Sequence, residues 1–214
     1  PKIQIIGVEP AGAACMKASM EAGHVVGLPE VDTIADGTAV KMPGDLLFPY
    51  IQENVDEIIT VEDSELIVAF LDMVENHKMI VENSGLLTVA ALKHMDVKKK
   101  KIVSILSGGN MDVITMASIV QHGLILRDRV FTVSVLLPDK PGELARVSAI
   151  LAEIQANVIK LEHNQFVSLN RNAAVELRIT MEAFGTEHKR EIVETLNDHG
   201  YRPKLVKGSG TYND

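Results

Sequence analysis

The first 124 residues alternate short apolar runs with stretches of helical spacing. Strand-like runs cover residues 2–8, 57–61 and 102–106. Between them, helical patterns cover about 13–22, 63–74, 84–93 and 111–122, and a loop runs over 27–44. Strands that alternate with helices predict a parallel, doubly wound α/β sheet. A sheet of only three strands buries too little of its apolar surface to be stable. We therefore expect further strands from sequence outside this chain.

A different order of elements follows a short linker at residues 125–128. Alternating or apolar runs predict strands at 130–137, 157–167, 173–181 and 201–206, with a turn at 170–172. Helical patterns lie at 143–154 and 186–199. The order β-α-β-β-α-β predicts a ferredoxin-like domain over 129–206, with a polar tail at 207–214.

Composition excludes several classes of protein. Hydrophobic residues make up 46% of the 214 residues and charged residues 23%, and the formal net charge is -8. The acidic balance disfavours nucleic-acid binding, and the basic run at 98–101 is typical of a solvated turn. No apolar stretch is long enough to span a membrane. With Cys15 as its one cysteine, the chain is expected in the reducing cytoplasm.

The most informative local feature is Ser107-Gly108-Gly109-Asn110, between an apolar run and a helical pattern. A strand that ends at a hydroxyl and two glycines presents the hydroxyl and free backbone N–H groups at one point. Such a corner suits a flat heteroaromatic ring or an anion. The alternative is an ordinary turn in which the serine caps a helix.

Four blocks along the first part carry a resemblance to a known family: residues 5–10 (IIGVEP), 33–37 (TIADG), 82–85 (ENSG) and 107–110 (SGGN). With them, the chain resembles the C-terminal part of a pyridoxal-phosphate-dependent threonine ammonia-lyase (threonine dehydratase, fold type II). A fifth block, 139–144 (DKPGEL), looks like the first loop of an ACT domain. The resemblance implies a catalytic part at 1–124 and an ACT regulatory domain at 129–206.

The resemblance assigns Ser107, Gly108, Gly37 and Glu82 to the cofactor site. Ser107 would meet the pyridine nitrogen, and a neutral hydroxyl stabilises a protonated ring less than a carboxylate would. This favours β-elimination: L-threonine to 2-oxobutanoate and ammonia, with L-serine as a slower substrate. Without the resemblance, Gly37 is equally a plain loop glycine, and Glu82 an acid favoured at a helix start.

The catalytic lysine of the family lies in the N-terminal half, and none of the lysines here stands in its motif. The chain begins at Pro1 and enters a strand pattern at once, so we expect a piece of a longer protein. We therefore expect this fragment to hold pyridoxal phosphate weakly or not at all, and to be inactive.

Some family members bind a divalent cation through the position of Glu9, the carbonyl of Ala13 and a carboxylate two residues later. Here that third position is Cys15. A thiol is a poor ligand for hard cations, so no metal site is predicted. A lone cysteine on a helix of small residues is more often a packing residue than a nucleophile.

In ACT domains, the first loop and the start of the next strand bind a small amino acid at a subunit interface. By resemblance the effector, isoleucine or valine, would contact Asp139, Pro141, Gly142, Leu144 and Asn157 of a homo-oligomer. The alternative is a domain that pairs sheets with a second copy and binds nothing.

Two further interpretations of the whole chain stay open: a stand-alone amino-acid-binding or dimerisation module, and a relative of serine dehydratase or racemase.

Overall fold

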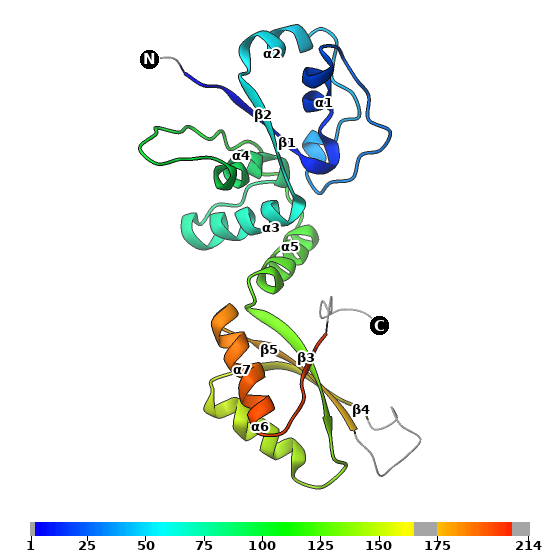
Figure 1. Cartoon of the computed structure of the whole chain (residues 1–214), viewed down its shortest axis with the longest axis vertical. Coiled ribbons are helices and arrows are strands. Elements are labelled where there is room, and N and C mark those ends of the chain that lie inside the picture. Colours follow the sequence, from blue (N-terminus) through cyan, green and yellow to red (C-terminus); the bar gives the residue numbers. More distant parts are fainter. Residues whose placement is uncertain (1–2, 165–174, 207–214) are drawn as a thin grey trace. The chain divides into compact units, whose positions relative to one another are not determined.

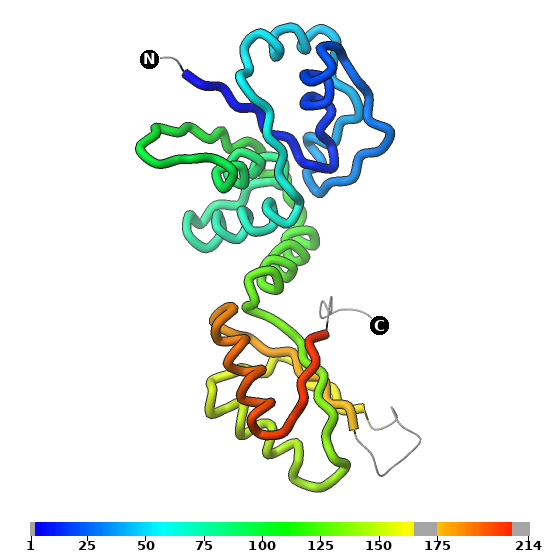
Figure 2. Tube along the Cα trace, in the orientation of Figure 1, coloured from blue at the N-terminus to red at the C-terminus, as the bar shows by residue number. Residues whose placement is uncertain are grey.

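The computed structural model describes residues 3–164 and 175–206. The chain divides into two compact units, Pro1–Gly123 and Leu124–Asp214. Figure 1 labels their elements, and Figure 2 traces the backbone through them. No helix among the described residues is both long and apolar enough to cross a bilayer.

The first unit contains a two-stranded parallel sheet of β1 (Ile6–Pro10) and β2 (Glu57–Val61). The predicted bounds of β2 are confirmed. β1 lies further along the chain than the predicted 2–8, and Ile3 and Ile5 are 80% and 47% exposed. They are exposed because the register begins only at the pair Ile6↔Glu57, so no strand covers the residues before it.

Helix α1 (Cys15–Ala22) follows a 3-10 turn and ends at Gly23, whose φ of 73° is left-handed, as the predicted helix required. The loop after it contains one 3-10 turn, η2 (Asp36–Thr38). Helix α2 (Phe48–Asn54) was not predicted from the sequence. Its proline in the first turn is compatible with a helix start, where the missing N–H is not needed.

Helix α3 (Asp63–Asp72) buries Leu66 and Phe70 completely and continues into a π-helical turn, η3 (Met73–His77). In the sequence, Thr60 and Asp63 have the spacing of a capping box, but this prediction is wrong because neither residue caps the helix. The helix is capped by Glu62 and Glu65, whose side chains receive each other's backbone N–H groups. The capping pair lies two residues later than Thr60 and Asp63, because Thr60 belongs to strand β2.

The predicted helix at 84–93 is a broken helical segment. It consists of η4 (Asn83–Leu86), α4 (Leu87–Ala90) and η5 (Ala91–His94). Leu86, Leu87 and Ala90 from this segment pack with α3 in the core of the first unit. The 3-10 turns at both ends are wound more tightly than the α-helical turn between them.

The predicted strand at 102–106 was wrong, because residues 101–112 form no strand or helix. Val103 and Ile105 are 89% and 72% exposed. Thr88 bonds the 102–106 run from the side: its hydroxyl donates to the Ile105 carbonyl (3.1 Å), and its carbonyl accepts the Ser104 hydroxyl. An apolar run becomes a strand only when neighbouring strands take its backbone hydrogen bonds, and the described residues offer none here.

Helix α5 (Val113–Leu126) continues through Gly123, where the sequence predicted its end. Gly123 is buried, and a Cβ there would lie 2.6 Å from Leu71 Cδ1 and 3.2 Å from Ile67 Cγ2. The glycine therefore allows α5 to approach α3 closely and does not terminate the helix.

The second unit has the predicted order β-α-β-β-α-β. Its antiparallel sheet has the strand order β4-β5-β3-β6, and its core joins the sheet to both helices through side chains such as Val133, Ile179, Leu151 and Leu196. The elements are β3 (Val130–Leu137), α6 (Glu143–Glu153), β4 (Asn157–Asn164), β5 (Val175–Glu182), α7 (Thr186–Asp198) and β6 (Lys204–Leu205).

Strand β6 is much shorter than the predicted 201–206 because only Lys204 and Leu205 pair with β3. Every residue of β4 is exposed, and within the described sheet β4 bonds to β5 alone. The predicted turn at 170–172 and the tail at 207–214 lie outside the described residues.

Candidate functional site

Two of the four sequence blocks meet at Glu82, the residue that precedes η4. The Glu82 backbone N–H donates to the Gly108 carbonyl (3.4 Å), and its carboxylate accepts the N–H of Asn110 (3.3 Å). The hydroxyl of Ser84 donates to the other carboxylate oxygen at 2.9 Å. The loops at 82–85 and 107–110 are therefore joined by backbone and side-chain hydrogen bonds.

Glycines occupy the points where these loops approach most closely. A Cβ on Gly108, whose φ is +79°, would lie 2.1 Å from Glu82 Cδ. A Cβ on Gly85 would lie 1.8 Å from the Ser107 carbonyl oxygen, and one on Gly37 would lie 2.6 Å from Ser84 Oγ. At Gly85 a side chain would collide with the Ser107 backbone, and at Gly37 and Gly108 the side chains of Ser84 and Glu82 would have to move, so glycine at these positions allows the three loops to approach.

Neighbouring elements hold the third loop, residues 33–37, against this pair. At the start of α3, Asp63 accepts the Thr33 hydroxyl (2.6 Å) and the Ile34 N–H (3.0 Å). From η4, the Asn83 side-chain amide donates to the Ile34 carbonyl (3.0 Å). The backbone of Ile34 is thus fixed on both sides, three residues before Gly37.

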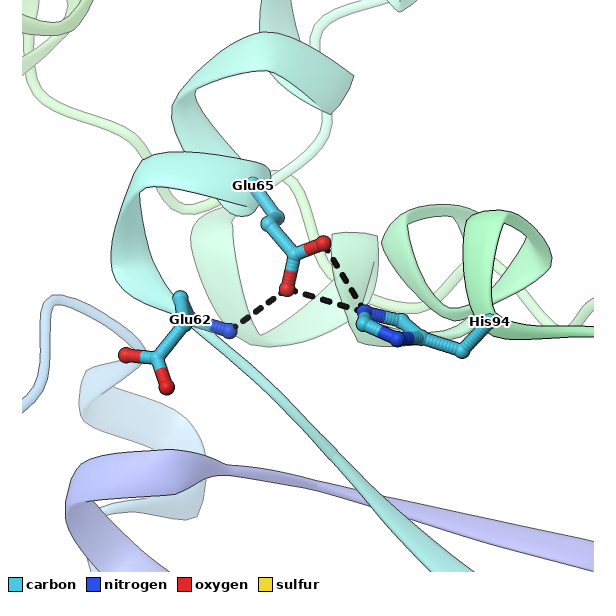
Figure 3. Close-up of polar contacts among 3 residues, drawn as sticks. All are labelled: Glu62, Glu65 and His94. Carbon is cyan, nitrogen blue, oxygen red and sulfur yellow. Dashed lines mark hydrogen bonds and ion pairs between the residues drawn. The ribbon is translucent and has the colours of Figure 1, made fainter.

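The start of α3 is itself anchored, as Figure 3 shows. Glu65 accepts the backbone N–H of Glu62 (2.9 Å) and the Nε2 of His94 at 2.8 Å and 3.0 Å. Burial alone would raise the pKa of the Glu65 carboxyl, but the Glu62 N–H and the His94 imidazole outweigh it and hold that pKa below its ordinary value. The contact between Glu65 and His94 links the first turn of α3 to η5.

Ser107 is exposed, and its hydroxyl has no hydrogen-bond partner among the described residues. It sits between Leu106 and Gly108, on the same loop that bonds to Glu82. The residues present fit a flat heteroaromatic ring, because an unengaged hydroxyl lies beside backbone that carries no side chain at Gly108 and Gly109. The predicted cofactor residues Ser107, Gly108, Gly37 and Glu82 are thus gathered in one cluster.

The Glu9 carboxylate accepts hydrogen bonds from the first turn of helix α1. Its two carboxylate oxygens accept the N–H groups of Met16 and Lys17, each at 2.8 Å, at the start of α1. A carboxylate there satisfies donors that the helix leaves unpaired and interacts favourably with the helix dipole. Within the described residues, no cluster of three or more His, Cys, Asp or Glu side chains could hold a metal ion.

Cys15 is 4% exposed, and its thiol lies 3.9 Å from Glu9 Oε1. Burial raises the pKa of the Cys15 thiol, and the negative charge of Glu9 raises it further. A thiol kept protonated by its surroundings is a weak nucleophile. The geometry agrees with a packing role for this residue.

In the second unit, the predicted effector residues fall into two groups at opposite ends of the sheet. The loop with Asp139, Pro141 and Gly142 follows the end of β3, and Gly142 (φ 94°) precedes α6. Asn157 pairs with Glu182, which in turn pairs with Val130 at the other end of β3. Seven residue steps of about 3.3 Å put the two groups ~23 Å apart within one copy.

Two members of the site were missed in the sequence. Asp63 was assigned only to a helix cap, and Asn83 was part of a recognised block without a role of its own. Their partners at Thr33 and Ile34 are distant in the chain, by 30 and 49 positions. A polar residue at the first position of a helix is the one local signal that could have indicated Asp63.

Comparison with known proteins identifies the family of the first unit. The sequence model of the pyridoxal-phosphate dependent enzyme family matches residues 1–108. The chain therefore belongs to that family. Its mixed α/β architecture with a parallel sheet is consistent with fold type II of these enzymes.

Particular relatives extend the match. L-threonine ammonia-lyase of Geobacter sulfurreducens is 37% identical over 209 residues, which cover 97% of this chain and 52% of that protein. The chain thus spans about half the length of the curated relatives it matches. The processed form of threonine deaminase isoform 2 from Solanum lycopersicum is 36% identical with a TM-score of 0.52, over 56% of this chain and 36% of that one. Maize serine racemase is 36% identical with a TM-score of 0.50, over 55% and 38%.

Proposed function

We propose that this chain is the C-terminal part of a pyridoxal-phosphate-dependent threonine ammonia-lyase. The reaction is the β-elimination of L-threonine to 2-oxobutanoate and ammonia, with L-serine as a poorer substrate. The observation that carries the proposal is the meeting of the loops 33–37, 82–85 and 107–110 around Glu82. The match to the Geobacter enzyme over 97% of the chain supports it.

Pyridoxal phosphate supplies the electron-accepting ring on which the amino-acid substrate reacts. In this proposal the Ser107 hydroxyl hydrogen-bonds the pyridine nitrogen, while Gly37 and Gly108 let backbone approach the ring. Glu82 holds the loops together. Because a neutral hydroxyl does not keep the ring nitrogen protonated as a carboxylate would, Ser107 favours loss of the β-hydroxyl over transamination.

The chain by itself is proposed to be inactive. The lysine that holds the cofactor in this family and the loop that binds its phosphate are assigned to sequence that precedes Pro1. Mixing the isolated chain with pyridoxal phosphate therefore gives no lysine-bound visible absorption, whereas the full-length protein gives a strong band. A strong band from the isolated chain would overturn this part of the proposal.

For the second unit, we propose an ACT regulatory domain that binds isoleucine or valine in a homo-oligomer. Since Asp139 and Asn157 lie at opposite ends of one sheet, an effector that contacts both must lie between two copies. Exposed apolar side chains on β4, Val158, Ile159 and Leu161, support pairing with another copy. Calorimetry with isoleucine, valine and threonine tests this, and no heat for any of them leaves only a pairing role.

The proposed lyase with an ACT domain has three kinds of partner: a small amino-acid substrate, an amino-acid effector and further copies of the chain. The formal net charge of -8 gives no basis for a nucleic-acid partner, and we propose no membrane partner. The buried Cys15 is compatible with a reducing cytoplasm, which we propose as the location.

A racemase-type activity is the second candidate, because the likeness to maize serine racemase is equal in identity to that of the tomato deaminase. The two activities are separated by the product from L-serine in the full-length protein. Pyruvate and ammonia support the lyase, and D-serine supports the racemase. If neither forms with a cofactor-loaded protein, a stand-alone binding or dimerisation module is favoured.

A further inference from the structure

Asn83 is almost completely buried, with 7% of its surface exposed, and it lies between Glu82 and Ser84. Its Nδ2 donates to the Ile34 carbonyl oxygen at 3.0 Å. On the other side of the same residue, the Ile34 N–H donates to Asp63 Oδ2, also at 3.0 Å. The bond from Asn83 is a direct side-chain link between the loop that contains Gly37 and the turn that contains Glu82.

This link acts on the separation of the two loops near Gly37, where space is tight. A Cβ on Gly37 would lie 2.6 Å from Ser84 Oγ and 3.6 Å from Glu82 Oε1. Ser84 in turn donates to Glu82, whose carboxylate accepts from Asn110. A change in the bond from Asn83 therefore moves Gly37 relative to the whole cluster around Glu82.

Packing alone does not account for an asparagine at this position. Its Oδ1 is buried and has no hydrogen-bond partner among the described residues. A buried acceptor without a partner costs free energy, which an apolar residue of similar size would avoid. The donor Nδ2 is the part of the side chain that the structure uses.

We propose that Asn83 is a positioning residue of the cofactor site, which fixes the Gly37 loop against Glu82 through the Ile34 carbonyl. This inference rests on the proposed function, since it concerns how tightly that site holds pyridoxal phosphate. Asn83 does not itself touch the substrate or the ring. It acts through Ile34, Ser84 and Glu82.

The first test uses the chain itself and does not depend on the cofactor. Asn83→Asp replaces the donor with a carboxylate, which repels the Ile34 carbonyl. We expect the backbone amides of residues 35–39 to exchange hydrogen about tenfold faster. This corresponds to a free energy of local opening that is lower by ~1.4 kcal/mol. At acid pH, the protonated carboxyl donates again, and the difference from wild type at the same pH shrinks. Asn54→Asp is the matched control, because Asn54 Nδ2 also donates to a backbone carbonyl (Tyr50, 2.8 Å), but at an exposed position of helix α2.

The second test uses the full-length protein and titrates pyridoxal phosphate. Asn83→Asp and Asn83→Ala weaken cofactor binding by about tenfold or more and alter the absorption and emission of the bound cofactor, whereas Asn54→Asp changes neither. Asn83→Ala also removes the unpaired Oδ1, which makes it the safer variant for folding.

The outcomes separate the two levels of the proposal. If the wild-type full-length protein binds no cofactor, the proposed function fails. If it binds, and both Asn83 variants bind equally well with unchanged spectra, the positioning role is overturned while the function stands. If both variants unfold at a temperature where Asn54→Asp stays folded, Asn83 is a structural residue and the inference is equally overturned.

Discussion

Gly108 and Glu82 lie so close that a Cβ on the glycine would be 2.1 Å from Cδ of the glutamate. The Gly108 φ of +79° is also one that residues with a side chain rarely adopt. Two independent constraints thus act on one position. Together they make the approach of the 107–110 loop to Glu82 sensitive to any side chain at position 108.

Gly108→Ala is expected to lower the free energy of unfolding of the first unit by about 1–3 kcal/mol, because it adds both steric overlap and backbone strain. Gly109→Ala is the control. The nearest atom to a Cβ on Gly109 is 3.9 Å away, so its effect should stay within about 0.5 kcal/mol. Urea unfolding of the two variants makes the comparison, and equal midpoints for both would count against the contact.

The close packing of α5 on α3 makes a second prediction. Alanine favours a helix over glycine by about 1 kcal/mol, so Gly123→Ala should stabilise the chain if the helix were isolated. Because a Cβ there would lie 2.6 Å from Leu71 Cδ1, we expect a net loss of about 1–3 kcal/mol instead. Thermal unfolding shows whether Gly123→Ala lowers or raises the stability of the chain.

Ala117→Ser serves as the control for that variant, since Ala117 is an exposed residue of the same helix. Its expected cost is about 0.5 kcal/mol. An increase in stability for Gly123→Ala would mean that α5 ends before Gly123 or lies further from α3.

Asp128 makes a third prediction, one that depends on pH. Its carboxylate accepts the Lys189 ammonium (2.6 Å) and the Thr186 hydroxyl (2.9 Å). The Lys189 hydrogen bond is the main reason that the pKa of Asp128 lies below its ordinary value, against an opposing effect of burial. Near pH 7, Asp128→Asn should lower the stability of the second unit by about 1–2 kcal/mol, as read from hydrogen exchange of the β3 amides.

The sign of the pH effect follows from that direction. A carboxyl with a lowered pKa stabilises the folded state above its ordinary pKa, and the contribution is lost as pH falls through the folded-state value. The gap between wild type and Asp128→Asn should therefore close in acid. Glu187→Gln on the same helix removes an exposed ion pair with Arg190 and should change stability by less than about 0.5 kcal/mol at any pH. A gap that persists in acid would contradict the role of the Asp128 charge.

Much of the fold could be predicted because its signals are local. Strands β2 and β3 have the predicted bounds, and helices α6 and α7 end within one residue of them. β3 shows an apolar period of two and the two helices a period of about 3.6 residues, patterns that depend only on which face is buried, whereas β2 is a short apolar run. The blocks at 33–37, 82–85 and 107–110 could also be recognised from the sequence. Serine and glycine at fixed places in a loop form a local motif, which does not depend on the residues that contact it in the folded chain.

What the sequence could not predict depends on partners far along the chain. The apolar run at 102–106 has the composition of a strand, but a strand also needs neighbours, and the described residues place none beside it. Gly123 looked like a helix end because its contact with Leu71 is a tertiary one. Asn83 and Asp63 gained their roles only when the chain brought Ile34 between them.

The most direct test of the central claim is a single assay on the full-length protein loaded with pyridoxal phosphate. With L-threonine as substrate, we predict 2-oxobutanoate and ammonia in equal amounts, and loss of the activity with a weakened cofactor band in Ser107→Ala. A cofactor-loaded protein that leaves L-threonine unchanged, or a Ser107→Ala variant identical to wild type in both spectrum and rate, would contradict the account.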